Sequence, residues 1–174
     1  MIKTVITYPD KRLKEVSQPV EKFDNDLEVI LDDMYDTMMS ENGVGLAAIQ
    51  VALPIRVLLL NIPDEEGEQH KKNLIEMINP VITQTEGAAT YQEGCLSVPG
   101  FYEDIERAET VTATYFDRSG NEHTVEAKDL LAVAIQHEMD HLDGKLFIEK
   151  LSYAKRKKFE KELKKQLRDN KKAS

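Results

Sequence analysis

Two histidines four residues apart, His137 and His141, carry the clearest chemical signal in the sequence, and a glutamate, Glu138, follows the first of them. On a helix this H-E-x-x-H spacing places both imidazoles on one face, where they can bind one metal ion. A metal ion that hydrolyses bonds usually has three protein ligands and one open position. The pattern therefore predicts a catalytic metal site whose third protein ligand comes from elsewhere in the chain. The alternative, two core histidines bonded to carbonyl groups, is less favoured for this pattern.

Several side chains come into question as the third ligand. One H-E-x-x-H family uses a third histidine six residues after the second, but this chain has Phe147 there, and phenylalanine cannot bind a metal. Another family uses a glutamate from a later helix. Glu160 and Glu162 lie at such a distance, but they stand in a lysine-rich tail, where pairing with lysines is expected instead. His70 and His123 lie in polar segments and are expected at the surface.

Cys95 remains, and it is the only cysteine of the chain. A lone cysteine is usually an inert core residue. Here its thiolate would complete a Cys-His-His site and leave the fourth position to water. A single cysteine also excludes an internal disulfide, which fits a reducing cytosol. We therefore expect Cys95 to be the third ligand.

The segment that carries the histidines is predicted to be a buried helix over 129–144. Its first half, Leu130 to Ile135, is apolar on every side, which is typical of a helix inside the protein. Asp129 is expected to cap its start and Gly144 to end it. An earlier helix is predicted from Asp24 or Asn25 onward, with Gly43 as its stop.

The remaining sequence indicates an α+β fold of antiparallel or mixed β-sheets packed around the central helix, with an N-terminal helix and a C-terminal helical tail. Residues 109–128 read as a β-hairpin with its turn at 117–121, and residues 74–87 as two extended pieces broken at Asn79-Pro80. We expect one catalytic domain, 1–150, with a basic tail, 151–174, that belongs to it. No run of eighteen apolar residues and no signal region occur, so we expect a cytoplasmic protein without membrane partners.

Three motifs together resemble the peptide deformylases. They are G-V-G-L-A-A-I-Q at 43–50, E-G-C-L-S at 93–97 and Q-H-E-M-D-H at 136–141, in the order and with the spacing of that family. The resemblance covers essentially the whole chain. It implies a metal-dependent hydrolase that removes the formyl group from the N-terminal formyl-methionine of nascent polypeptides.

The resemblance also implies roles for individual residues. Cys95, His137 and His141 match the metal ligands, and Glu138 matches the general acid/base. The implied working metal is one Fe²⁺ ion, for which Zn²⁺, Ni²⁺ or Co²⁺ can substitute; a Cys-His-His set accepts zinc readily on ligand grounds. Further residues match positions that hold the formyl group and the peptide: Gly43, Val44, Gly45, Gln50, Glu93, Gly94 and Leu96.

Helix register adds a pocket for the methionine side chain. Leu130, Val133 and Ala134 lie one or two turns before His137 on the same face, where an apolar wall suits a thioether. The Gln50 amide and the Leu96 N–H are expected to donate to the developing oxyanion. Gln50 could instead only tie its loop to the sheet. If the helix is buried, the Asp140 carboxylate needs a partner of opposite charge, and the resemblance to the family indicates Arg107.

Charge is distributed unevenly along the chain. Residues 150–174 carry eleven basic and three acidic residues, a net charge of +8, whereas the chain as a whole carries −9. Phe159, Leu163 and Leu167 recur every fourth residue, so 152–169 is predicted to be a helix with one apolar stripe. We expect this helix to contact the ribosome, or else to dock on the acidic body, in a monomer that does not bind DNA.

Two other functions remain open from the residues alone. One is an H-E-x-x-H metallopeptidase that cuts internal peptide bonds, against which the missing third histidine or glutamate argues. The other is a non-catalytic, metal-stabilised module that binds RNA through its tail. Glu138 argues against the second, because a structural metal site needs no base beside it.

Overall fold

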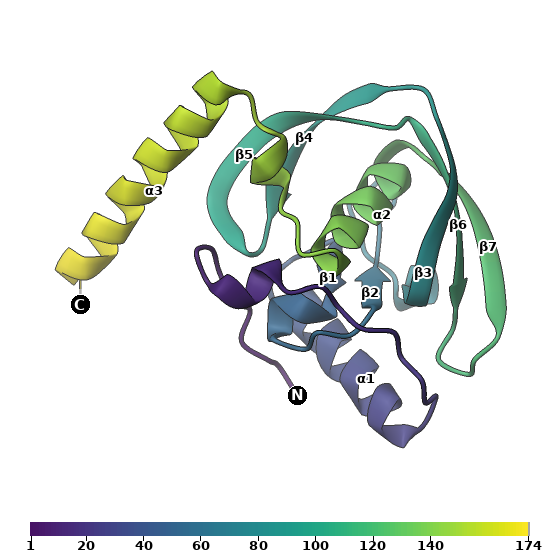
Figure 1. Cartoon of the computed structure of the whole chain (residues 1–174). Helices are drawn as coiled ribbons and strands as arrows, with labels where there is room; N and C mark the ends of the chain where they lie inside the picture. Colours follow the sequence, from purple (N-terminus) through teal and green to yellow (C-terminus); the bar gives the residue numbers. More distant parts are fainter. Residues whose placement is uncertain (174) are drawn as a thin grey trace.

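The computed structural model describes residues 1–173 and is an α+β fold (Figure 1). A five-stranded antiparallel sheet has the order β1-β2-β3-β6-β7, and β4 and β5 pair as a separate antiparallel ribbon. The strands are β1 (Gly45–Ala47), β2 (Val57–Leu60), β3 (Ile75–Glu86), β4 (Ala89–Cys95), β5 (Val98–Arg107), β6 (Thr110–Phe116) and β7 (Glu122–Lys128). The helices are α1 (Asn25–Ser40), α2 (Asp129–Leu142) and α3 (Tyr153–Ala173). The predicted fold class is confirmed.

Helix α2 lies at the centre, between the five-stranded sheet and the β4–β5 ribbon (Figure 1). The run V-L-L-L of β2 is apolar throughout, so the strand can pack against a helix on each face of the sheet, because successive side chains point to opposite faces. Leu58 and Leu60 pack with Ile135 of α2, whereas Val57 and Leu59 pack with α1 on the other face. The β1–β2 end of the sheet is therefore covered on both sides, and α2 holds its histidines inside the protein.

Helix α1 begins as predicted and ends differently. The Asp24 side chain accepts a hydrogen bond from the Leu27 N–H at 3.1 Å, which confirms Asp24 as the N-cap. The predicted stop at Gly43 is wrong: Asn42 has the positive φ of 55° that ends the helix. Asparagine tolerates this left-handed conformation better than other residues that have a Cβ, so it can take the place usually held by glycine.

Two further boundaries correct the sequence reading. The predicted cap at Asp129 is wrong, because Lys128 is the N-cap and no side chain caps α2; Asp129 itself has φ 55°. Gly144, with φ 73°, does follow the end of α2 as predicted. Residues 75–86 form one strand rather than two pieces, and Asn79-Pro80 produces a shift of register against β6. A β-bulge of this kind accommodates a residue that cannot donate to the ladder.

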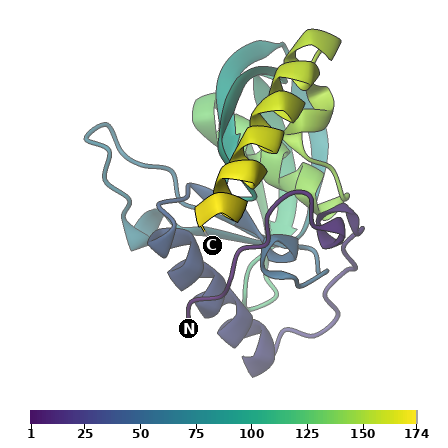
Figure 2. The ribbon, with the colours of Figure 1, turned by 90° about the vertical axis from the view of Figure 1, so that its left-hand side faces the viewer.

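Helix α3 runs along one side of the molecule and turns most of its length toward solvent (Figures 1 and 2). Phe159 is its buried anchor, with its ring 4.7 Å from that of Phe101 and 5.6 Å from that of Tyr8. Leu163 is half-buried and Leu167 is exposed, so the predicted apolar stripe is buried only over the first half of the helix. In residues 1–173 we find no helix with the length and apolar character that crossing a membrane requires.

Candidate metal centre and its pocket

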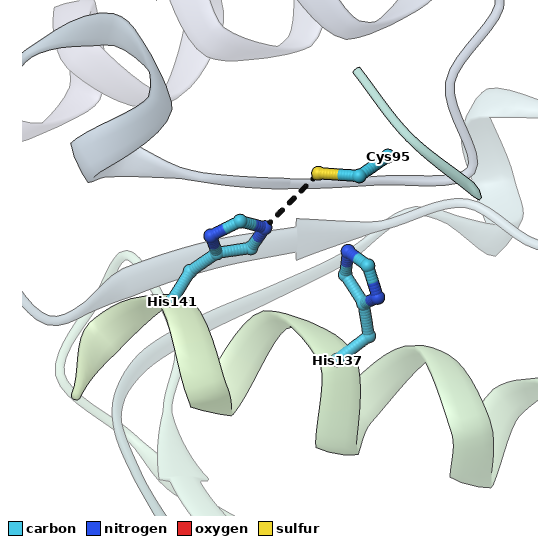
Figure 3. A group of neighbouring side chains, drawn as sticks. All are labelled: Cys95, His137 and His141. Carbon is cyan, nitrogen blue, oxygen red and sulfur yellow. Dashed lines mark hydrogen bonds between the residues drawn. The ribbon is translucent and has the colours of Figure 1, made fainter. Parts of the chain in front are cut away.

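His137 and His141 point from one face of α2 toward Cys95 at the end of β4 (Figure 3). Both imidazoles are buried, with ring centroids 5.1 Å apart. The Cys95 Sγ lies 3.3 Å from the His141 Nε2, and ligand atoms of all three residues lie within 4.8 Å of one another. The structure thus brings together the three side chains that the sequence singled out.

This donor set fits a single metal ion. A thiolate and two imidazoles suit zinc and other late first-row metals, and bonds of about 2.0–2.3 Å to one ion match the 3.3 Å between the Cys95 Sγ and the His141 Nε2. The His141 Nδ1 is buried and has no hydrogen-bond partner within residues 1–173. In that part of the chain, no other cluster of three or more His, Cys, Asp or Glu side chains is close enough to bind an ion.

Glu93 orients His137. Its carboxylate lies 2.8 Å from the His137 Nδ1 and also accepts two hydrogen bonds from Arg107, at 2.7 and 2.9 Å. Burial alone would raise the pKa of Glu93, but the bonds to Arg107 and His137 outweigh burial and lower it. Because an ionised carboxylate can only accept, the His137 Nδ1 must donate, which leaves its Nε2 free to bind a metal.

Arg107 also donates to Asp140 at 2.7 Å, which confirms the predicted pair. The link from Arg107 through Glu93 to His137 was not predicted. A buried guanidinium has five N–H donors, so one aspartate could not satisfy it. From the sequence one could therefore have predicted that Arg107 needs a second acceptor, but not that this acceptor is Glu93.

Glu138 lies on the inner side of α2 with its side chain buried, and its Oε2 has no partner among the described residues. Burial raises the pKa of Glu138 to about 7. A Cβ placed on Gly45 would come within 2.9 Å of the Glu138 Oε1. Only glycine therefore lets β1 approach this carboxylate so closely.

Gln50 joins the first two motifs. Its Oε1 accepts from the Ala47 N–H at 2.9 Å, and its Nε2 donates to the Ser97 Oγ at 3.1 Å and lies 3.6 Å from the Cys95 Sγ. The side chain does tie its loop to the neighbouring segment, as the alternative interpretation held. Its amide nitrogen also faces the thiol of the metal site.

A pocket of about 740 Å³ opens beside these groups. It is lined by all the predicted site residues except His141: Gly43, Val44, Gly45, Gln50, Glu93, Gly94, Cys95, Leu96, Leu130, Val133, Ala134, His137 and Glu138. Leu130 is 41% exposed, which corrects the expectation that the first half of α2 is buried all round. Leu130 is one of the residues that line the pocket.

Other lining residues were not predicted. They come from the N-terminal segment and from the residues on both sides of the second motif, and include Lys3, Thr4, Val5, Thr7, Tyr91, Gln92, Pro99, Gly100 and Tyr102. Extended N-terminal residues carry no chemical pattern, so only the fold reveals them. His70 and His123 lie at the surface as expected, paired with Asp64 and Asp117. Glu160 pairs with Arg156 and Lys157 as expected.

Known proteins carry the same architecture. The sequence profile described as "Polypeptide deformylase" matches residues 2–157. The chain belongs to the polypeptide deformylase family. A peptide deformylase of Nautilia profundicola is 58% identical over 168 residues, which cover 97% of each chain. A crystal structure of a peptide deformylase from Legionella pneumophila has a TM-score of 0.89 at 40% identity and covers 98% of each chain.

A Met-Ala-Ser-bound peptide deformylase from Acinetobacter baumannii has a TM-score of 0.81 at 33% identity, covering 87% of this chain and 99% of that one. These relationships confirm the family that the three motifs indicated. The deformylase removes the N-formyl group from formylated nascent peptides, and metal dependence is a property of its family. Both the metallopeptidase and the non-catalytic RNA-binding alternatives are thereby set aside.

Proposed function

We propose that Cys95, His137 and His141 bind the catalytic metal and that Glu138 is the general acid/base of deformylation. The convergence of the three ligand atoms within 4.8 Å, next to the buried Glu138, carries this proposal. Bound there, a divalent metal supplies Lewis acidity that activates water. Glu138, with a pKa raised to about 7 by burial, can take a proton at its carboxylate and deliver it to the leaving amine.

Fe²⁺ is the metal that we propose, one ion per chain, with Zn²⁺, Ni²⁺ or Co²⁺ as possible substitutes. The support is the resemblance of the three motifs to the deformylases together with the mixed sulfur and nitrogen ligand set. Glu93 would hold His137 in the tautomer that binds metal whichever ion is present.

The formyl oxygen is proposed to accept hydrogen bonds from the Gln50 amide and the Leu96 backbone N–H. Gln50 is buried, and its Nε2 lies 3.6 Å from the Cys95 Sγ, next to the proposed metal site. Donors held in place before the reaction stabilise a developing oxyanion without reorganisation. Gly45 would contribute by leaving room for the Glu138 side chain beside β1.

The peptide is proposed to lie between the segments 43–46 and 93–97, as an added strand. Strand β1 is at an edge of the five-stranded sheet, so one of its sides carries no strand from the described chain. Gly43, Val44, Glu93 and Gly94 would contribute through their backbones, since the Glu93 carboxylate is engaged with Arg107 and His137. The relative from Acinetobacter baumannii binds Met-Ala-Ser, so a short peptide is a reasonable ligand for this chain as well.

The methionine side chain would enter the apolar part of the pocket, against Leu130, Val133 and Ala134. An unbranched thioether adapts well to such a wall. We also propose a cytoplasmic monomer without DNA partners, in which 1–150 form the catalytic domain and the basic tail 151–174 contacts the ribosome.

One assay tests the proposed placement of the formyl group. The metal-loaded enzyme is given formyl-Met-Ala-Ser, acetyl-Met-Ala-Ser and a longer peptide with a free amine. A new free amine is the readout, because formyl, acetyl and internal peptide-bond hydrolysis all release one. It is expected from the first peptide alone, together with formate, because a methyl group has little room between Gln50, Leu96 and the metal site. Gln50→Ala should lower kcat more than it raises KM. Comparable rates on the formyl and acetyl peptides would contradict this picture of the pocket.

A further inference from the structure

The connection between β2 and β3, residues 61–74, folds back onto the first motif. Gln69 makes the contact: its Nε2 donates to the Gly43 carbonyl at 2.9 Å and to the Asn61 carbonyl at 2.7 Å. Gln69 is half-buried in an otherwise exposed loop tip.

Gln69 continues the ladder between β1 and β2 beyond its last backbone bond. That bond joins the Asn61 N–H to the Val44 carbonyl at 2.8 Å. The next backbone acceptors along the two chains, the carbonyls of Gly43 and Asn61, both receive the Gln69 amide instead. The side chain therefore fixes the spacing of the two backbones where β1 enters the pocket.

Little freedom is available at that point. Gly43 lines the pocket, and a Cβ on it would lie 2.8 Å from the Leu96 Cδ1. Asn61 is fully buried, and its side-chain amide has no partner within the described residues. Apart from the Met38 carbonyl, which accepts from the Gly43 N–H at 2.9 Å, Gln69 is the group that holds Gly43 from outside the motif.

Asp64 gives the loop a fixed shape. Its Oδ1 accepts from the N–H groups of Glu66 and Glu68, each at 2.9 Å, and its Oδ2 lies 2.7 Å from the His70 Nε2. The Asp64 N–H in turn donates to the Glu68 carbonyl at 2.9 Å. These bonds hold the loop on both sides of Gln69, so its side chain is presented in one position.

We propose that Gln69 is a positioning residue for peptide binding. Its amide holds the Gly43–Gly45 backbone in the place where the peptide residues after methionine pair with it, and Asp64 holds the loop that presents Gln69. The inference rests on the proposed peptide site along 43–46. It assigns a role in substrate affinity, not in the chemical step, to a loop remote from the metal ligands.

The test compares Gln69→Ala with the wild type on formyl-Met amide and formyl-Met-Ala-Ser. In the wild type, KM should fall as the peptide lengthens. Gln69→Ala should raise KM for the tripeptide about five-fold, the effect of roughly one lost hydrogen bond, with kcat nearly unchanged and a smaller effect on the short substrate. Gln69→Glu keeps the size of the side chain but turns a carboxylate toward two carbonyls, so it should raise KM at least as much.

Gln84→Ala is the matched control, since the Gln84 Nε2 donates only to the exposed Glu86, at 2.7 Å, on the distal half of β3. It should leave both KM values unchanged.

If the wild type gains affinity with peptide length but Gln69→Ala leaves KM unaltered, the inference fails and the proposed peptide site stands. If the wild type shows no dependence on length, the peptide site and this inference both fail. A lower melting temperature with an unchanged KM would also overturn the positioning role, because it would show a purely structural contribution.

Discussion

Glu138 combines two properties that rarely occur together in a carboxylate. It is buried next to the proposed metal ligands, and its Oε2 has no partner within residues 1–173. Its neighbour in the sequence, His137, is instead held by Glu93 through a 2.8 Å contact. One carboxylate of the site is thus kept ionised to orient a ligand, whereas the other has a pKa raised to about 7 and can exchange a proton.

The substitution Glu138→Gln tests proton transfer separately from metal binding. The amide has almost the same shape but cannot carry a proton from water to the leaving amine, so turnover of formyl-Met-Ala-Ser should fall by about 10²–10⁴-fold. Bound metal should remain, because no ligand changes. Metal analysis and a formate assay on the same preparation measure both quantities. A variant that keeps more than a tenth of the wild-type rate would exclude Glu138 as the general acid/base.

At the residue scale, the sequence predicted those features that depend on short spacing. His137, Glu138 and His141 lie within one helical turn and a half, so helix geometry alone places them together. Cys95 followed because it is the only thiol. The bond between Glu93 and His137 joins residues 44 positions apart, and only the packing of β4 against α2 brings them into contact.

Arg107 joins two elements, the end of β5 and helix α2. Its guanidinium is almost fully buried between Glu93 and Asp140, with three donor–acceptor distances of 2.7–2.9 Å. Removing one member of a buried ion network leaves the other charges without compensation in a medium of low dielectric constant. The attachment of α2 to the β4–β5 ribbon therefore depends on this side chain.

Arg107→Met should lower the free energy of unfolding by about 3–5 kcal/mol, the usual effect of breaking a buried ion pair. Thermal and denaturant unfolding measure the loss. Arg12→Met is the control, because Arg12 pairs with Asp10 in an exposed position and its replacement should change stability hardly at all. Equal effects of the two substitutions would contradict the importance assigned to the buried network.

Element types were easier to predict than element ends. The period of α2 and the alternation of 109–128 identify a helix and a hairpin, because long apolar patterns reflect the core that they face. The end of α1 at Asn42 and the continuous strand through Asn79-Pro80 depend on the left-handed conformation of one residue and on a bulge. Neighbouring strands decide such features, so local preference alone is a weak guide to them.

At the scale of the whole molecule, α3 has two separable halves. The first half holds the helix on the body through the buried Phe159 and half-buried Leu163. The second half carries Lys164, Lys165, Arg168, Lys171 and Lys172, and its Gln166 Nε2 donates to the Pro99 carbonyl at 3.4 Å. The packing of α3 on the body and the positive charge of its second half can therefore be tested with separate truncations.

Removal of residues 164–174 should leave the melting temperature and the turnover of formyl-Met-Ala-Ser nearly unchanged, because Phe159 stays in place. Ribosome binding should weaken and lose part of its dependence on salt, since basic groups bind RNA by releasing counterions. Removal of 154–174 is the comparison, and loss of Phe159 from the core should lower stability by about 3–5 kcal/mol. Co-sedimentation at several salt concentrations measures the binding. Identical sedimentation of full-length and 164–174-truncated protein would refute the ribosome contact.

The ligand set of Cys95, His137 and His141 is the central claim, and X-ray absorption spectroscopy of the zinc-loaded protein tests it most directly. The wild type should show one sulfur at about 2.3 Å and two imidazole nitrogens at about 2.0–2.1 Å from the metal, the usual lengths for zinc. In Cys95→Ala, the sulfur contribution should disappear, together with tight binding. A wild-type spectrum with only nitrogen and oxygen neighbours, or one in which Cys95→Ala retains the sulfur, would contradict the proposed metal centre.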